Sequence, residues 1–181
     1  MCAGEAPPRP QHHSMKLTIK DAGKPARTDL FSLLLPAGVD AEVPSHVDVP
    51  EGFLAGFDAK PRATRSTFAV SGQAKEVMLV GLGEHESVDE ECLRRAAAVA
   101  VKAALARKVK SIHIEVDGVA AASAGGPETA GRAIAEGALL ATYAFTESKS
   151  KPDAVVLGTI SLGGPGAGFK RGAKLGQLLA A

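Results

Sequence analysis

The sequence predicts an α/β fold in which helices pack on a mixed β-sheet. Stretches that favour strands alternate with stretches of helical periodicity from Met15 onward, which is the pattern of a layered α/β domain. The segment Val77–Val80 is apolar at every position, as in a strand that is covered on both faces. Aromatic residues make up only 4% of the chain, so the core must be aliphatic and rich in small side chains. We therefore expect three layers, with the sheet flanked by helices.

Length, charge and cysteine content exclude several classes of protein. The 181 residues suffice for one domain, and 21 Lys and Arg against 20 Asp and Glu leave a net charge of +1, without the basic excess typical of nucleic-acid binding. The only cysteines, Cys2 and Cys92, exclude a disulfide framework and a four-cysteine zinc site. No signal peptide and no run of roughly 18 apolar residues is present. We expect a soluble, cytoplasmic protein without a membrane partner.

The amino-terminal part is expected to contain an extension and two strands. Residues 1–14 are proline-rich and polar and should form a flexible extension, and either Met1 or Met15 could be the natural start. Leu17 and Ile19 suit a short strand, and Leu30–Leu35 suits a buried strand that ends at Pro36. Thus the folded domain should begin at Met15.

The next region is expected to be irregular and then to form a hairpin. Residues Asp40–Arg65 contain three prolines and read as loops with one short helix, whose apolar side chains would be Phe53, Leu54 and Phe57. Thr67–Val70 and Glu76–Val80 read as two strands joined by Ser71–Gln73.

Two helices and a strand follow. Ser87 and Glu90 form a capping box, and four apolar residues then recur at helical spacing: Leu93, Ala97, Ala100 and Ala104. Ser111–Val116 alternates as a strand, with His113 and Glu115 on its second face. Pro127 should occupy the first turn of a helix whose small side chains allow close approach of another element.

The carboxy-terminal part is expected to contain one strand, one loop and the start of a helix. Ala154–Leu157 is an apolar strand, Gly163–Gly168 a flexible loop, and Ala173–Ala181 a helix that is still apolar at the last residue. We therefore expect three segments, 1–14, 15–160 and 161–181, with the last one leading into a domain that is absent from this chain.

No motif predicts a catalytic, cofactor-binding or metal-ligating residue. Gly81 and Gly83 lie where a strand turns toward a helix, but Glu86 replaces the third glycine of a dinucleotide fingerprint. Gly163–Lys170 lacks the Gly-Lys-Ser/Thr of a phosphate-binding loop. The histidines lack metal spacing: His12, His13, His46, His85 and His113. His113 is expected to be a packed or surface residue.

Charged clusters on the long helix are expected to be solvated. Asp89, Glu90 and Glu91 favour the helix amino terminus rather than a paired acid-base site. A basic stripe follows on and after the helix: Arg94, Arg95, Lys102, Arg107, Lys108 and Lys110. We expect solvent to surround this stripe, and the alternative is that it contacts nucleic acid or a protein partner.

Two blocks of sequence resemble the amino-terminal domain of the leucyl (cytosol) aminopeptidases. The first is Val77–Gly83 followed by Leu93–Ala97, and the second is Ala135–Phe145 followed by Lys149-Ser150, with a Glu-Gly pair and a Tyr-x-Phe in the family's order. The basic residue usually found between Tyr and Phe is Ala144 here. Residues 172–181 resemble the linker helix that leads into the catalytic domain.

The resemblance implies a macro-domain-like, non-catalytic domain that serves assembly and access in a hexamer. Complete members are metallo-exopeptidases that use two zinc or manganese ions to release residues such as leucine from peptides. Their metal ligands and their Asn-Thr-Asp-x-Glu-Gly-Arg motif belong to the carboxy-terminal domain, and this chain has no asparagine. The chain alone is therefore not expected to be an enzyme. Two alternatives stay open, a macro-type module that binds an ADP-ribose-like nucleotide at Gly81–Gly83, and a nucleic-acid accessory domain.

Overall fold

The structure, a computed structural model, describes residues 16–19, 27–40, 42–143 and 157–180. The predicted extension at residues 1–14 lies outside these ranges. The predicted strand at Leu17 and Ile19 is confirmed as β1, Lys16–Ile19.

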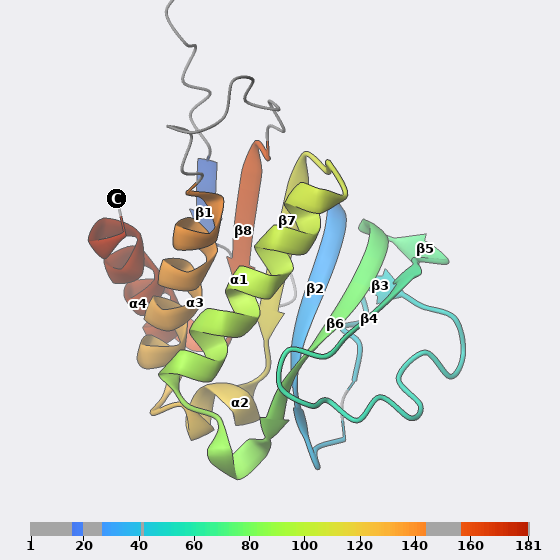
Figure 1. The fold of residues 1–181 in the computed structure, drawn as a ribbon, viewed down its shortest axis with the longest axis horizontal. Helices are drawn as coiled ribbons and strands as arrows, with labels where there is room; N and C mark the ends of the chain where they lie inside the picture. The colour runs from blue at the N-terminus through green and yellow to red at the C-terminus, as the bar shows by residue number, and fades with distance from the viewer. Residues whose placement is uncertain (1–15, 20–26, 41, 144–156, 181) are drawn as a thin grey trace, which may run out of the picture.

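A mixed sheet of six strands forms the centre of the domain (Figure 1). Its order is β1-β8-β7-β2-β6-β4, and every neighbouring pair is parallel except β4 with β6. The remaining bounds are β2 Thr28–Ala37, β4 Thr64–Phe68, β6 Ala74–Glu84, β7 Ser111–Val116 and β8 Thr159–Gly163. The mixed α/β sheet is thus confirmed. The buried strand at Leu30–Leu35 and the strand at Ser111–Val116 are confirmed as well. The antiparallel pairing of the two hairpin strands is also confirmed, but the first strand ends at Phe68 rather than Val70, and Ser71 and Gly72 of the predicted turn form a short strand of their own.

The α-helices of the described residues, four in number, lie on one face of the sheet (Figure 1). They are α1 Glu90–Ala106, α2 Gly118–Ser123, α3 Pro127–Thr142 and α4 Gly166–Leu179. Alternate strand residues such as Met78, Ile112 and Ile160 pack with these helices in one buried aliphatic cluster. Burial of this apolar surface, at about 25 cal/mol per Å², holds the helices on the sheet. Pro127 begins α3, as the sequence predicts.

A non-helical segment, residues 43–57, covers the other face of the sheet. Val43, Val49, Phe53, Leu54 and Phe57 from this cover segment pack against a second buried cluster that contains Phe31, Leu33, Val77 and Leu79. Within this segment, the short strand β3 (Val47–Asp48) pairs antiparallel with β5 (Ser71–Gly72). The three expected layers are therefore present, but the third contains no helix among the described residues.

The short helix expected around Phe53, Leu54 and Phe57 is wrong. Gly52 and Gly56 have φ values of +76° and +65°, which no right-handed helix contains. The guanidinium of Arg65 donates hydrogen bonds to the carbonyls of Phe53, Ala55 and Gly56, at 2.7 to 3.2 Å. An arginine from the neighbouring strand β4 thus takes the place of the helical hydrogen bonds.

The capping box predicted at Ser87 and Glu90 is also wrong. Ser87 ends a short 3₁₀ helix, η1 (His85–Ser87), and α1 begins two residues after Val88. The N-cap is Asp89, whose carboxylate accepts a hydrogen bond from the Cys92 backbone N–H at 2.7 Å. This bond holds the pKa of Asp89 below its usual value.

The carboxy-terminal elements differ from the expected ones in position. Of the strand expected at Ala154–Leu157, residues 154–156 lie outside the described ranges, and Leu157 precedes β8 without belonging to it. The loop expected at Gly163–Gly168 is shorter, because Gly163 ends β8 and Gly166 already begins α4. The expected domain division after residue 160 therefore falls inside β8, and the helix expected from Ala173 starts earlier.

Candidate functional site

The two blocks that carry the family resemblance meet where α1 crosses α3. Arg94 lies on α1 and Glu136-Gly137 on α3. A Cβ atom added at Gly137 would overlap the backbone carbonyl of Arg94, so only glycine allows this approach of the two helices. The Glu-Gly pair therefore has a structural role at a helix crossing.

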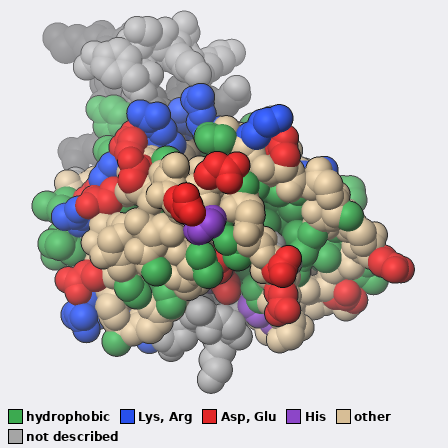
Figure 2. Space-filling model, turned by 90° about the horizontal axis from the view of Figure 1, so that it is seen from below, with side chains coloured by type: hydrophobic (Ala, Val, Ile, Leu, Met, Phe, Trp, Pro, Cys, Tyr) green, Lys and Arg blue, Asp and Glu red, His purple; other side chains and the backbone are tan. Residues whose placement is uncertain are grey.

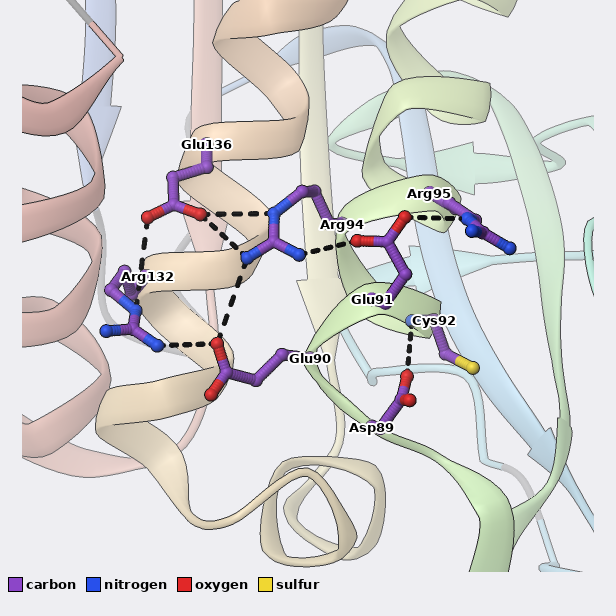
Figure 3. A network of polar contacts seen from close by, with 8 residues as sticks. All are labelled: Asp89, Glu90, Glu91, Cys92, Arg94, Arg95, Arg132 and Glu136. Atoms are coloured by element: carbon purple, nitrogen blue, oxygen red, sulfur yellow. Dashed lines mark hydrogen bonds and ion pairs between the residues drawn. The ribbon is translucent and has the colours of Figure 1, made fainter.

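A network of ion pairs surrounds this crossing (Figure 3). Glu136 Oε2 accepts hydrogen bonds from Arg94 Nη2 at 2.8 Å and from Arg94 Nε at 3.1 Å, and Glu91 Oε2 accepts from Arg94 Nη1 at 2.6 Å. Hydrogen bonding to Glu136 first, and to Glu91 second, raises the pKa of Arg94. The side chains of Glu136 and Arg94 are only 16% and 28% exposed, so solvent screens this pair less than it screens a surface pair.

The network extends to both sides of Arg94. Arg132 on α3 pairs with Glu90 on α1, and Arg95 Nε donates to Glu91 Oε1 at 2.7 Å (Figure 3). Three carboxylates thus face three guanidinium groups across two helices. The arrangement joins α1 to α3 and does not resemble an acid-base pair poised over a substrate.

The basic stripe does not form a continuous cationic surface. Arg94 and Arg95 are neutralised by the network, and Arg107 Nε donates to Glu76 Oε1 at 2.9 Å. Arg107 also donates to Ser66 Oγ at 3.0 Å, which joins the end of α1 to the sheet. Only the lysines of the stripe have no ion pair within the described part of the chain: Lys102, Lys108 and Lys110. This distribution does not favour the nucleic-acid alternative.

Gly81 and Gly83 also have a packing role. Gly81 lies inside β6, and a Cβ there would overlap the backbone at Ala59 and Lys60. Gly83 has φ +89°, and its N–H donates to the Ala59 carbonyl at 2.8 Å. The strand-to-helix turn expected here begins later, at His85. Backbone from another loop covers the place where a nucleotide would need to lie.

The carboxyl end of the sheet carries an acidic surface. A cavity of about 400 Å³ lies at the end of β2, and the titratable side chains that line it are Asp40 and Asp58. Glu84 and Glu86 are exposed at the same end. Figure 2 looks onto this end and shows acidic side chains over the middle of the face, with basic side chains at its rim. Asp58 is paired with Lys60 at 2.9 Å, and the remaining carboxylates disfavour a phosphate here, although α/β sheets commonly bind nucleotides at this end.

A buried polar cluster lies on the face of the sheet that the cover segment protects. His113 Nδ1 lies 2.9 Å from Ser161 Oγ, and His113 Nε2 lies 3.1 Å from Glu115 Oε2. Their exposures are 0%, 5% and 7% for His113, Ser161 and Glu115. His113 is therefore packed, one of the two expected outcomes, but its partnership with Ser161 on β8 was missed. The even alternation of β7 could not show it, because the partner comes from another strand.

No metal centre is formed by the described residues, since they contain no group of three or more His, Cys, Asp or Glu side chains able to hold an ion. None of the described helices has the length and apolar character needed to span a membrane.

Comparison with known families gives one match, to the description "Cytosol aminopeptidase family, N-terminal domain", over residues 54–152. Similar relatives include a probable cytosol aminopeptidase of Roseiflexus castenholzii, 31% identical over 144 residues, which are 77% of this chain and 28% of the relative. The probable cytosol aminopeptidase of Clostridium perfringens is 33% identical over 114 residues, which are 63% of this chain and 22% of the relative. The chain therefore spans about a quarter of the length of these two relatives.

Two solved structures share the fold. The bottromycin maturation enzyme BotP has a TM-score of 0.62 and 24% identity, and the match covers 84% of this chain and 30% of that one. A mutant of tomato leucine aminopeptidase has a TM-score of 0.63 and 17% identity, with 94% of this chain and 37% of that one covered. At these identities the likeness concerns the fold.

Proposed function

Because the chain belongs to the cytosol aminopeptidase family, as the amino-terminal domain of its members, we propose that it serves a metal-dependent aminopeptidase in assembly and access control. Hydrolysis of amino-terminal residues such as leucine from peptides would take place in a carboxy-terminal catalytic domain. The match over residues 54–152 carries this proposal. The chain spans only about a quarter of these relatives, which supports a larger whole protein. We further propose that this protein is cytoplasmic, as the relatives' name suggests, and that it is active as the homo-hexamer that the resemblance implies.

The metal ions of the proposed enzyme would belong to the catalytic domain. The residues described here do not suit a two-metal centre, since no group of three metal-binding side chains exists among them. Metal use by the family is supported by a structure described as BotP in complex with Mn, which matches this chain with a TM-score of 0.61 and 23% identity. Zinc or manganese would activate water there.

A face of α4 is suited to contact the catalytic domain. Leu175, Leu178 and Leu179 follow one another at helical spacing and are 43%, 77% and 64% exposed. Exposed leucines grouped in this way mark an interaction surface rather than a solvated one. The neighbouring side of α4 is already buried on α3, since a Cβ at Gly172 would overlap the carbonyl of Glu128. We propose that these leucines pack on the catalytic domain that follows in the same polypeptide.

An activity assay tests the division of labour. The 181-residue chain should release no p-nitroaniline from leucine p-nitroanilide with added Mn²⁺ or Zn²⁺, whereas the polypeptide extended through its catalytic domain should turn the substrate over. Metal-dependent turnover by the 181-residue chain would contradict the proposal.

The leucine surface has its own test. Replacement of Leu178 and Leu179 by glutamate should leave the melting temperature of the 181-residue chain almost unchanged, because both side chains are exposed. In the polypeptide extended through its catalytic domain, the same two substitutions should split thermal unfolding into two transitions, because the two domains would no longer be packed together. A matched control is Val119→Glu on α2, where the side chain is 44% exposed and lies outside the leucine surface. If the extended polypeptide with both substitutions still unfolds in one transition at the unchanged melting temperature, the leucines do not pack on the catalytic domain.

A further inference from the structure

His46 belongs to the cover segment, and its ring packs against Phe31 of the sheet. Its ring meets the ring of Phe31 edge-on, with centroids 5.5 Å apart, and Phe31 also stacks on His113, with centroids 5.3 Å apart. One phenyl ring thus contacts both imidazoles. The carbonyl of His46 accepts a hydrogen bond from the Gln73 N–H at 3.1 Å, which fixes the residue beside β3 and β5.

The His46 side chain is placed as a neutral ring. Its Nε2 atom is buried and has no hydrogen-bond partner among the described residues. A neutral imidazole can leave this nitrogen as a bare acceptor, whereas an imidazolium must bury an N–H without a partner. Burial is the first cause that lowers the pKa of His46, and the charge of His113 acts in the same direction.

The charged groups that act on His46 come from β7 and do not cancel this effect. Glu115 would stabilise a charged His46, but its carboxylate already lies 3.1 Å from His113 Nε2. From β2 and β5, His46 meets the uncharged residues Phe31 and Gly72. Protonation therefore places a charge where burial disfavours it and where the adjacent carboxylate has another partner.

Opening of the cover segment would remove this penalty. The long-range polar contacts of the segment lie in two places. Around β3 they are the β3–β5 pair and the bonds from Gln73 N–H to the His46 carbonyl, from Val70 N–H to the Asp48 carbonyl and from Ser71 Oγ to Asp48 Oδ2. Farther along the segment they come from the Arg65 guanidinium. In an open form His46 would titrate near its ordinary value of about 6.5. The open form would then take up a proton that the closed form resists, so opening becomes easier as the pH falls below this value.

We propose that His46 makes the cover segment, residues 43–57, an acid-sensitive lid over the apolar face formed by Phe31, Leu33 and Leu79. Above neutral pH the lid stays closed and the apolar face stays buried. Below about pH 6.5 the lid opens more often, by at most about tenfold for each pH unit.

Hydrogen exchange of the 181-residue chain, followed by mass spectrometry at pH 7.5 and 5.5, tests the lid. Protection factors corrected for intrinsic exchange are compared between peptides from residues 43–57 and peptides from β6. Protection of the lid should fall about five- to tenfold at pH 5.5 relative to β6. His46→Gln, which cannot be protonated, should reduce this fall to less than about twofold.

Two further variants complete the design. His46→Phe also removes the titrating group but keeps a ring at this position. It serves as a second test if glutamine weakens the lid at both pH values. His85→Gln changes a histidine outside the cover segment and should behave as the unchanged chain does. Equal protection of the lid at both pH values in the unchanged chain would overturn the proposal. A fall that persists in both His46 variants would overturn it as well.

Discussion

The two faces of the sheet are built in different ways. On the helix face, glycines bring backbones into direct contact and ion pairs close the edges of the helix crossing. On the cover face, irregular chain packs on the sheet and a histidine, a glutamate and a serine lie among the apolar residues. A helix satisfies its own backbone, while the cover segment depends on Arg65 and on a two-residue ladder. The helix face should therefore unfold as one unit with the domain, and the cover face should open locally.

The largest effect is expected at the α3–α4 contact. Gly172→Ala places a methyl group against the carbonyl of Glu128, which is backbone and cannot move aside without separating the helices. Gly168→Ala, one turn earlier on the same face of α4, meets its nearest atom only at 3.6 Å. Urea unfolding should show a loss of about 3 kcal/mol for Gly172→Ala and a gain of about 0.5 kcal/mol for Gly168→Ala. Similar changes in unfolding free energy for both variants would mean that α3 and α4 can move apart without a loss of stability.

A pair of leucines compares the two faces directly. Leu93 on α1 is fully buried, whereas Leu54 in the cover segment is only partly buried. Leu93→Ala should cost about 3 kcal/mol of unfolding free energy and Leu54→Ala about 1 kcal/mol. Chemical denaturation followed by circular dichroism measures both. A larger loss at Leu54 would show that the cover face contributes as much to global stability as the helix face.

The ion pair at the helix crossing should contribute less than the glycine contacts. In a double-mutant cycle with Arg94→Gln and Glu136→Gln, we expect a coupling energy of about 1–2 kcal/mol, because the pair is partly buried and bidentate. The more exposed pair of Arg171 on α4 and Glu128 on α3 serves as the control, with a coupling energy of less than about 0.5 kcal/mol expected. Equal couplings would argue that burial of Arg94 has no energetic consequence.

The smallest effect distinguishes the observed helix cap from the expected one. Asp89→Ala removes the carboxylate that accepts the Cys92 N–H and should cost about 1 kcal/mol. Ser87→Ala should change the unfolding free energy by less than about 0.5 kcal/mol, since this residue ends η1 and does not cap α1. If Ser87→Ala lowers the unfolding free energy more than Asp89→Ala does, Ser87 caps the helix and the predicted capping box is correct.

Local pattern was sufficient to predict most elements of the helix face. The alternation at Ser111–Val116, the apolar run at Val77–Val80 and the proline at the start of α3 each depend on neighbours within one turn or one strand. The cover face was predicted less well. Phe53, Leu54 and Phe57 have helical spacing, but glycines at positive φ and a distant arginine decide their conformation. The cap at Asp89 was missed because the spacing of Ser87 and Glu90 matches a capping box, whereas the helix begins only after Asp89, whose backbone is extended.

By itself the sequence determined most strands of the sheet and the two long helices α1 and α3, the aliphatic core, and the two blocks shared with the aminopeptidase family. These properties follow from residue type and short-range spacing, which chain neighbours decide. The tertiary structure alone decided that Gly137 meets Arg94, that Ser161 meets His113, and that His46 meets Phe31. Such contacts join residues that are far apart in the chain, and they depend on how helices and strands pack around the same sheet. No local periodicity encodes which distant side chain will fill a given space.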